Sequence, residues 1–391
     1  MPALEEFLRP FHVHFKRSEA RHALERYLTG MLTEHPNKNC DTIAQVVPGT
    51  SEQSLQGLLT VMSWDEDDLN EQRVKAMLAL PTEGDAALVF DDTGFAKQGK
   101  ASVGVARQYS GTLGKVGNCQ LAVNCHYAER TIAWPVATRL YLPREWTSDP
   151  QRMKKAKVPE GTPFQTKPQI ALDLLDRADE MGVPYAAVVA DADYGDNPKF
   201  LEGLEDREKR YVAAVRKDFA VALTAGGPAQ RAEVVLAALP RRRWRTIRWR
   251  EGGKGWLQAR FCVLRCWREP SAGVRVPGWL IGERPARGGQ QDRWKYHWSN
   301  FPAGATLERM VGYAHRRFGV EQFHEESKGL LGWDQYQGRL WAGFHRNSVL
   351  VMLAYSFLVC QEWQHRQEVT LRGRPRGACS PSARPPAGVP A

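Results

Sequence analysis

The first eighty residues carry apolar positions at helical spacing. Such spacing covers residues 20–32, 53–64 and 69–80. A polar run over residues 35–39, which contains Pro36, separates the first stretch from the second. Apolar residues three and four positions apart share one side of a helix, so each stretch is expected to bury that side. The pattern predicts a compact helical domain over residues 1–80.

From residue 85 the pattern changes to short apolar runs, which are typical of buried strands. Residues 86–90 form one run that ends in Asp91 and Asp92, and residues 185–190 form another that ends in Asp191. Two further strands are predicted over residues 119–127 and 131–142, followed by a helix over residues 167–181. The order of three strands, a helix and a fourth strand predicts an α/β fold and is compatible with an RNase H-like mixed sheet, whose first part would be residues 81–217.

The C-terminal half is expected to contain a β-rich insertion and then long helices. The insertion covers residues 218–301, with candidate strands at 260–267, 278–282 and 293–298. Residues 302–365 then complete the sheet domain with helices over residues 307–328 and 344–364. The remaining residues, 366–391, are rich in Pro, Arg, Gly and Ser, and a disordered tail is predicted there.

The composition is that of an ordinary globular protein, with 42% hydrophobic and 25% charged residues. No apolar run approaches the roughly eighteen residues of a membrane helix. The first thirty residues lack the apolar centre of a signal peptide, so a cytoplasmic, nucleoid-associated protein without membrane contact is expected. Seven irregularly spaced cysteines argue against a secreted disulfide framework. The pairs Cys119/Cys125 and Cys262/Cys266 lack CxxC spacing, which favours core cysteines over a zinc site.

The net charge is +10, from 54 basic and 44 acidic residues. A basic balance of this kind favours a polyanionic partner, because phosphate contacts release counterions. A genome whose base composition favours arginine codons would produce the same excess, so charge alone leaves both interpretations open.

Carboxylates stand at three places where chemistry could use them: Asp92, Asp191 and Glu321. Phosphoryl transfer uses two divalent ions, and Mg²⁺ prefers carboxylate oxygens, so three well-placed acids suffice. Strand alternation lets only one of Asp91 and Asp92 face such a site. We favour Asp92, since it directly precedes the turn expected at Thr93. The alternative is that these aspartates only cap turns.

Four charged residues are spaced along the helix predicted over residues 307–328. Intervals of four, four and three place Arg317, Glu321, Glu325 and Lys328 on one helical face. A solvated, salt-bridged stripe is the simple interpretation. Apolar neighbours such as Val320 and Phe323 favour instead a helix that packs against a core.

Residues 90–100 read FDDTGFAKQGK, continued by SVGV, RQY, GTLGK and NCQ up to residue 120, and residues 190–196 read ADADYGD. Together with the spacing of Arg317, Glu321 and Lys328, these segments resemble bacterial insertion-sequence transposases with a DDE catalytic domain. The spacing resembles the family signature Tyr-x2-Arg-x3-Glu-x6-Lys. It departs from the signature at the tyrosine, because Ala314 stands at that position and Tyr313 is one residue early.

The resemblance implies a DNA transposase on an RNase H-like fold. Asp92, Asp191 and Glu321 would hold Mg²⁺ or Mn²⁺, and the enzyme would cut at a transposon end and transfer the 3′-hydroxyl to target DNA. Arg317 and Lys328 would contact phosphates near the cut. The partner would be double-stranded DNA, as terminal repeats and target, bound by a homodimer, with the helical domain as an end-binding unit.

Two other classes remain open beside the active transposase. One is a catalytically inactive DNA-binding protein derived from a transposase. The other is an RNase H-like nuclease that cuts DNA without strand transfer.

Other basic residues have two interpretations each. The segment 241–250 holds six arginines and two tryptophans, and alternation would put Arg248 and Arg250 opposite Trp249. It is either a DNA contact or the charged face of an edge strand. Side chains beside the first aspartates either follow the scissile strand or form a solvated loop; they are Lys97, Lys100, Arg107 and Lys115. His324, His345 and Arg346 are further candidates for phosphate contact.

Overall fold

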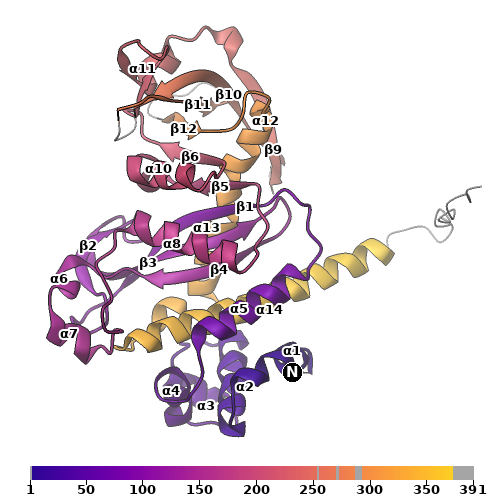
Figure 1. Cartoon of the computed structure of the whole chain (residues 1–391). Coiled ribbons are helices and arrows are strands. Elements are labelled where there is room, and N and C mark those ends of the chain that lie inside the picture. Colours follow the sequence, from indigo (N-terminus) through magenta and orange to yellow (C-terminus); the bar gives the residue numbers. More distant parts are fainter. Residues whose placement is uncertain (1, 253–254, 270–272, 287–292, 373–391) are drawn as a thin grey trace, which may run out of the picture.

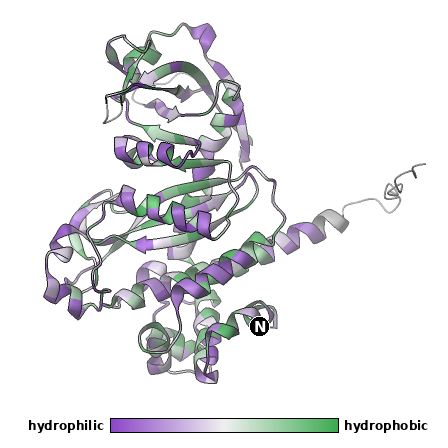
Figure 2. Ribbon diagram, in the orientation of Figure 1, coloured by the Kyte–Doolittle hydropathy of each residue, from purple (hydrophilic) through white to green (hydrophobic). Residues whose placement is uncertain are grey.

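A computed structural model of the chain describes residues 2–252, 255–269, 273–286 and 293–372. A large mixed sheet forms its centre, with helices on both faces and a separate group of N-terminal helices beneath it (Figure 1). The strands are mostly hydrophobic, whereas the outward sides of the helices are hydrophilic (Figure 2).

The N-terminal helices follow the predicted periodicity and add three short helices that it missed, α1, η1 and α3. Their bounds are α1 Pro2–Leu8, η1 Arg9–His14, α2 Ser18–Leu32, α3 Cys40–Val46, α4 Glu52–Thr60 and α5 Glu66–Leu78. Asn39, Ser51 and Asp65 cap α3, α4 and α5 by accepting backbone N–H bonds. The apolar sides of these helices form one core with α14 (Trp341–Arg372), with Phe95 of β1 (Ala87–Ala96) and with Val103 in the loop that follows it. The helical region therefore packs as part of a core that continues past residue 80.

The central strands have the RNase H-like order β4-β3-β1-β5-β6. Here β3 is antiparallel to β1 and to β4, whereas β5 and β6 run parallel to β1. Sequence patterns missed two strands, the short edge strand β2 and the fifth central strand β6. The strand bounds are β1 Ala87–Ala96, β2 Ala106–Ser110, β3 Lys115–Ala128, β4 Ala133–Leu140, β5 Ala187–Ala190 and β6 Tyr211–Val215.

Strand β1 is longer than its apolar run predicts. It pairs with β3 along its whole length, from Ala87 opposite Ala128 to Ala96 opposite Cys119. The turn expected at Thr93 and Gly94 is therefore wrong, because these residues continue the strand. Gly94 is needed there, since a Cβ atom at this position would lie 2.0 Å from Ser110 Oγ.

Helices cover both faces of the sheet. Leu88 and Phe90 of β1 pack toward α8 and α10, while Ala87 and Val89 pack toward α12 and Val320 of α13. A capping box of Thr166 and Gln169 begins α8. The helix bounds on the first side are α6 Arg144–Thr147, α7 Pro150–Lys155, α8 Lys167–Glu180, α9 Ala192–Gly195 and α10 Pro198–Asp206.

The β-rich insertion continues the same sheet. Its strand β12 pairs antiparallel with β6, so the order runs on as β6-β12-β11-β10. The three predicted strands are present as β10, β11 and β12, and β9 pairs with β10. The bounds are β7 Ala220–Ala222, β8 Ala229–Arg231, α11 Ala232–Ala237, η2 Arg241–Arg243, β9 Arg245–Gly252, β10 Gly255–Arg268, β11 Val276–Pro285 and β12 Lys295–Ser299.

The helix predicted over residues 307–328 is interrupted by a 3₁₀ turn. It consists of α12 Leu307–Ala314, η4 His315–Arg317 and α13 Phe318–Gly329. After η5 Trp333–Gln335, α14 runs as Trp341–Arg372 between the N-terminal helices and β4 (Figure 1). The predicted tail starts inside this helix, and residues 373–391 lie outside the described residues. Within the described part of the chain, no helix is long and apolar enough to cross a membrane.

Candidate active site

Asp91 lies on β1, Asp191 directly follows the neighbouring parallel strand β5, and both face the same side of the sheet. Phe90 pairs with Ala190, so the next residue on each chain is an aspartate. Val89 and Val189 both face α12 and α13, and alternation places Asp91 and Asp191 on that side as well. Arg317 of η4 joins them, with Nη2 3.0 Å from Asp91 Oδ2 and 3.9 Å from Asp191 Oδ2.

Asp92 faces the opposite side of the sheet, where α8 lies. Lys167 is the first residue of α8, and its Nζ donates to both carboxylate oxygens of Asp92 at 3.1 Å. Burial raises the pKa of Asp92, and the Lys167 ammonium offsets part of that rise. Asp92 is thus held in an ion pair away from Arg317.

Asp191 has two roles in the local structure. Its Oδ1 caps α9 by accepting from the N–H of Asp193 at 3.0 Å and of Tyr194 at 3.4 Å, so the turn-capping interpretation holds for this oxygen. Its Oδ2 is directed to Arg317. Burial and the nearby Asp91 carboxylate raise the pKa of Asp191 to about 6. The pair carries more negative charge than one guanidinium balances.

The η4 turn ends one helix and begins the next beside these aspartates. It directs Arg317 to Asp91, and Glu321 follows one turn later on the exposed side of α13. Among the described residues, no group of three His, Cys, Asp or Glu side chains is already arranged around a metal position. The donors on this side are nevertheless hard carboxylate oxygens, of the kind that Mg²⁺ and Mn²⁺ prefer.

A cavity of about 740 Å³ adjoins Arg317 and Glu321. The sheet domain contributes Ala190 and Ala192, which flank Asp191, and the insertion contributes aromatic and basic side chains. Among the latter, the Trp249 ring stacks on His315 at 3.9 Å, and the Arg250 guanidinium lies 3.4 Å from the centre of the Phe318 ring. The insertion therefore reaches the helix that carries the glutamate.

The same wall holds a buried charge cluster that sequence patterns did not indicate. Glu283 of β11 lies 3.3 Å from His315 Nε2 and 3.7 Å from His297 Nε2. Burial raises the pKa of Glu283, but the two imidazoles outweigh it and hold the pKa well below its usual range. Glu283 is on β11, His297 on β12 and His315 in η4, within 32 positions of one another. Because they come from three elements, their spacing in the sequence does not indicate that they meet.

Lys328 and Lys97 are directed into the protein. Lys328 Nζ donates to Thr93 Oγ1, to the Gly94 carbonyl at 3.0 Å and to Thr112 Oγ1 at 3.3 Å. Lys97 Nζ donates to the Tyr336 carbonyl. Burial lowers the pKa of each lysine to about 8.

The remaining basic candidates are on the surface. Three of them are exposed: Lys100 in the loop between β1 and β2, Arg107 on β2 and Lys115 at the start of β3. Arg248 is exposed and its Nε donates to Gln258 at 3.2 Å. A bulge at Trp249 breaks the alternation predicted there, because Leu257 pairs with Arg250 and Gln258 with Arg248.

Tyr313 does not take the signature tyrosine's place. Its hydroxyl donates to Asp85, which also binds Arg316 at 3.0 Å and Arg309 at 3.4 Å. Tyr313 is fully buried, and it ties α12 to the segment before β1.

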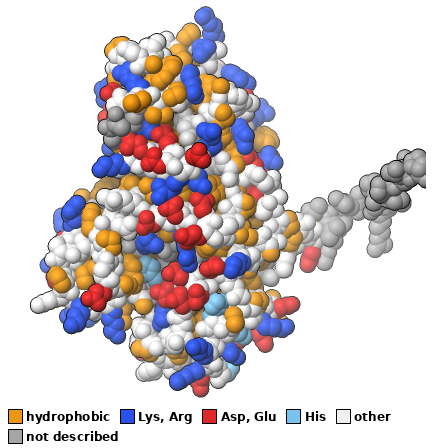
Figure 3. Space-filling view, viewed as in Figure 1, with side chains coloured by type: hydrophobic (Ala, Val, Ile, Leu, Met, Phe, Trp, Pro, Cys, Tyr) orange, Lys and Arg blue, Asp and Glu red, His pale blue; other side chains and the backbone are white. Residues whose placement is uncertain are grey.

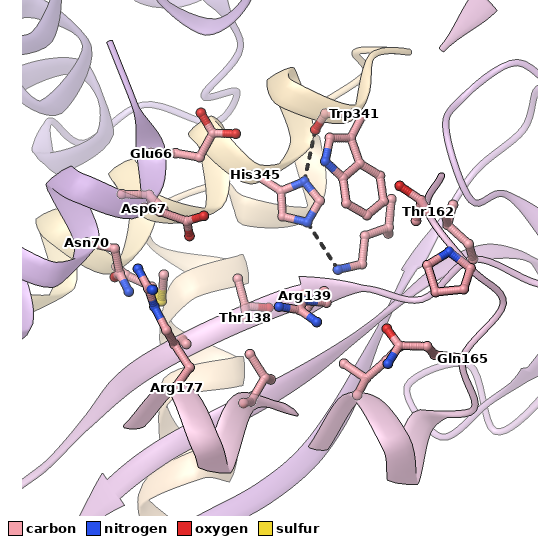
Figure 4. Close-up of a pocket in the computed structure, with 18 residues that line it drawn as sticks. Glu66, Asp67, Asn70, Thr138, Arg139, Thr162, Gln165, Arg177, Trp341 and His345 are labelled. Carbon is pink, nitrogen blue, oxygen red and sulfur yellow. Dashed lines mark hydrogen bonds between the residues drawn. The ribbon is translucent and has the colours of Figure 1, made fainter. Parts of the chain in front are cut away.

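A second cavity, of about 370 Å³, lies between α5, β4, α8 and α14, apart from the aspartates (Figure 4). His345 lines it, with Nδ1 3.0 Å from the Trp341 carbonyl and Nε2 accepting from the Leu140 N–H at 3.3 Å. Both nitrogens are thus used within the protein. On the face that carries α8 and α10, acidic and basic side chains lie near one another (Figure 3). One ion pair of this region joins Asp176 and Arg207, 2.6 Å apart.

Comparisons with known proteins give two family matches and one relative. A model described as DDE superfamily endonuclease matches residues 10–255, and one described as transposase DDE domain matches residues 165–357. A protein of Microchaete diplosiphon, described as a probable transposase for insertion sequence element IS701, is 27% identical over 320 residues. That alignment covers 80% of this chain and 76% of the relative.

Proposed function

Since the chain belongs to the DDE superfamily endonucleases, we propose that it is a transposase that cuts DNA at transposon ends and joins the new 3′-hydroxyl to target DNA. The family is one of nucleic-acid-cleaving enzymes, and DNA is its substrate. The Microchaete diplosiphon relative is described as a probable transposase, which supports the finer assignment.

The observation that carries the proposal is the pair Asp91 and Asp191 on one side of the sheet, joined by Arg317. We assign Asp91, Asp191 and Glu321 as the catalytic acids. Asp92 was the sequence-based choice for the first of them, and its ion pair with Lys167 on the other face favours Asp91 instead. Glu321 joins the set because it lies one helical turn after Arg317 on the same cavity wall.

We assign Mg²⁺ or Mn²⁺ as the cofactor. The raised pKa of Asp191 supports this, because burial and the nearby Asp91 carboxylate both disfavour its charged form, and a bound divalent cation would offset that cost. When bound, such ions activate the attacking oxygen and stabilise the leaving oxygen of a phosphoryl transfer. The chain's own task is to present Asp91 and Asp191 from rigid strands and to bring Glu321 to them on α13.

Arg317 is assigned to the scissile phosphate. Its guanidinium lies between the two aspartates, and a planar fork suits two phosphate oxygens at once. Arg250 extends the positive charge along the same cavity. We further propose a homodimer on DNA, with one active site for each transposon end.

The test is to incubate the full chain with labelled terminal-repeat DNA, target plasmid and Mg²⁺. Cleavage at the repeat and covalent joining to the plasmid are both expected, and both should stop when EDTA replaces Mg²⁺. Cleavage without joining would establish the nuclease alternative. Specific binding of the repeats without either reaction would establish the inactive DNA-binding alternative.

A further inference from the structure

A chain of polar side chains crosses from β4 to α13 beside the catalytic aspartates. Thr138 Oγ1 lies 2.6 Å from Asn124 Oδ1, and Asn124 Nδ2 lies 3.2 Å from His324 Nε2. Asn124 is the residue directly opposite Asp91 in the β1–β3 pairing, so both side chains face α13. These hydrogen bonds connect Asn124, which pairs with Asp91 across the strands, to α13, the helix that carries Glu321.

The direction of the His324 bond follows from the other contacts of Asn124. Its Nδ2 also donates to the Ala122 carbonyl at 3.3 Å, and a carbonyl oxygen only accepts. The amide nitrogen must therefore face both Ala122 and His324. His324 Nε2 is then the acceptor, and the imidazole proton is on Nδ1. Burial lowers the pKa of His324 to about 4, which is consistent with a neutral ring.

We propose that His324 is a positioning residue, whose Nε2 accepts from Asn124 and thereby sets where α13 holds Glu321 relative to Asp91. The proposal rests on the function proposed above. His324 is three residues after Glu321 and seven after Arg317, the last residue of η4, so the three lie on one side of the continuous helical segment formed by η4 and α13.

The surroundings of His324 leave this bond without a substitute. Its ring packs near the aromatic rings of Phe323, Trp333 and His126, with centre distances of 5.9, 6.3 and 5.8 Å. Both ring nitrogens of His126 are buried and, among the described residues, have no hydrogen-bond partner. Asn124 is thus the polar side chain that fixes the His324 ring. A displacement of about 1 Å at a reacting group costs on the order of a hundredfold in rate.

Two amide substitutions separate positioning from mere packing. A glutamine oxygen reaches about the place of Nε2, whereas an asparagine side chain reaches only about as far as Nδ1. We expect His324→Gln to keep kcat for cleavage within about threefold and His324→Asn to lose about tenfold or more. KM for DNA should stay within about twofold in both, because the bond involves no substrate. His22→Asn, at an exposed histidine of α2, is the control. Equal kcat for the two His324 variants would overturn the proposal.

A second experiment removes Asn124, the hydrogen-bond partner of His324. In an Asn124→Ala background with a matched melting temperature, the difference between the Gln and Asn variants should disappear; its persistence would overturn the proposal. Nitrogen-15 NMR of histidine-labelled protein should assign an Nδ1–H tautomer to His324, changed by Asn124→Ala. This readout needs no activity. A chain that cleaves no DNA but shows the tautomer would contradict the proposed function alone, and an Nε2–H tautomer would overturn the bridge itself.

Discussion

The two faces of β1 place adjacent aspartates in different electrostatic surroundings. On the α8 face, Asp92 is matched by one ammonium, that of Lys167. On the α13 face, Asp91 and Asp191 share one guanidinium, that of Arg317. The first arrangement is a balanced ion pair that stabilises the start of a helix. In the second, two carboxylates are ion-paired with one guanidinium, before Glu321 is counted; the Lys328 ammonium also acts on Asp91, but its hydrogen bond is to Thr93.

This difference separates a structural acid from a catalytic one. Both aspartates are largely buried, so burial alone does not distinguish them. A balanced pair has little to gain from a divalent cation, whereas an unbalanced group lowers its free energy by binding one. Charge balance across the strand therefore selects Asp91 as the metal ligand.

The largest expected effect on cleavage comes from replacing Asp91 and Asp92, each in a separate variant, by asparagine. Asp91→Asn should lower Mg²⁺-dependent cleavage about a thousandfold, because metal stabilisation of the transition state is worth several kcal/mol. Asp92→Asn should stay within about tenfold and mainly lower the melting temperature, since it leaves Lys167 without its partner. Cleavage rates at matched folded concentration measure both.

The two variants also distinguish the other ways in which Asp91 and Asp92 could contribute to the site. An inactive Asp92→Asn with an active Asp91→Asn would move the first ligand to Asp92. Loss of activity in both folded variants would mean that both carboxylates are required. The double variant Asp92→Asn/Lys167→Met, which removes both charges, should recover stability if the pair is structural.

The sequence could predict that one of the two aspartates faces the site, but not which one. Alternation follows from any strand, whereas the face is set by long-range pairing with Asn124 and Ala190, which local patterns do not contain. The choice of Asp92 depended on a turn at Thr93, and β3 pairs through that position. Four of the five central strands, β1, β3, β4 and β5, were predictable from their apolar runs, whereas β6 was missed. The edge strand β2 was missed because its exposed residues lack such a run.

A second test asks whether Glu321 acts together with Asp91 and Asp191 on the α13 face of β1. Glu321→Gln should lower cleavage about a hundredfold to a thousandfold while DNA binding stays within a few-fold, because it removes a metal ligand and no phosphate contact. Glu325→Gln, four residues later on the same helix and also exposed, is the matched control. Wild-type cleavage by Glu321→Gln, or equal losses in both variants, would remove Glu321 from the site.

The charge imbalance also predicts a pH-dependent stability without metal. The pKa of Asp191 is raised to about 6, so between about pH 4 and 6 the folded chain binds a proton that the unfolded chain releases. The stability that this proton contributes is present below about pH 4 and is lost as pH rises through 6. Asp191→Asn keeps a good helix cap and should therefore gain about 1–2 kcal/mol over wild type between pH 4 and 7.5. Urea unfolding in EDTA measures this.

Added Mg²⁺ should reduce or reverse the difference between the free energies of unfolding of the wild-type chain and the Asp191→Asn variant. It should stabilise the wild-type chain at pH 7.5, by about 2.7 kcal/mol at a hundred times Kd, and should leave Asp191→Asn nearly unchanged. A wild-type chain indifferent to Mg²⁺, or a variant stabilised equally, would contradict the assignment of Asp191 as a ligand.

The smallest expected effect concerns the arginines of β9, whose surroundings differ as those of the aspartates do. Arg245 is paired with Glu308 at 2.6 Å. Among the residues that the structure describes, Arg248 bonds only the neutral Gln258, and Arg250 lies on the Phe318 ring beside Glu321. If Arg248 and Arg250 contact phosphates, each Ala substitution should reduce the slope of log K against log salt by about 0.9 on duplex DNA.

Arg245→Ala is the matched control for this measurement, because Glu308 already neutralises that guanidinium, and its slope should equal wild type. Arg250→Ala should in addition lower kcat several-fold, since the Arg250 guanidinium packs on α13 next to Glu321, whereas Arg248→Ala should change binding alone. Unchanged slopes for both arginines would assign the segment to an edge strand with a charged outer face. A reduced slope for Arg245→Ala as well would show that ion pairs on this strand open on DNA, and charge balance would then fail as a guide to which side chains bind phosphate.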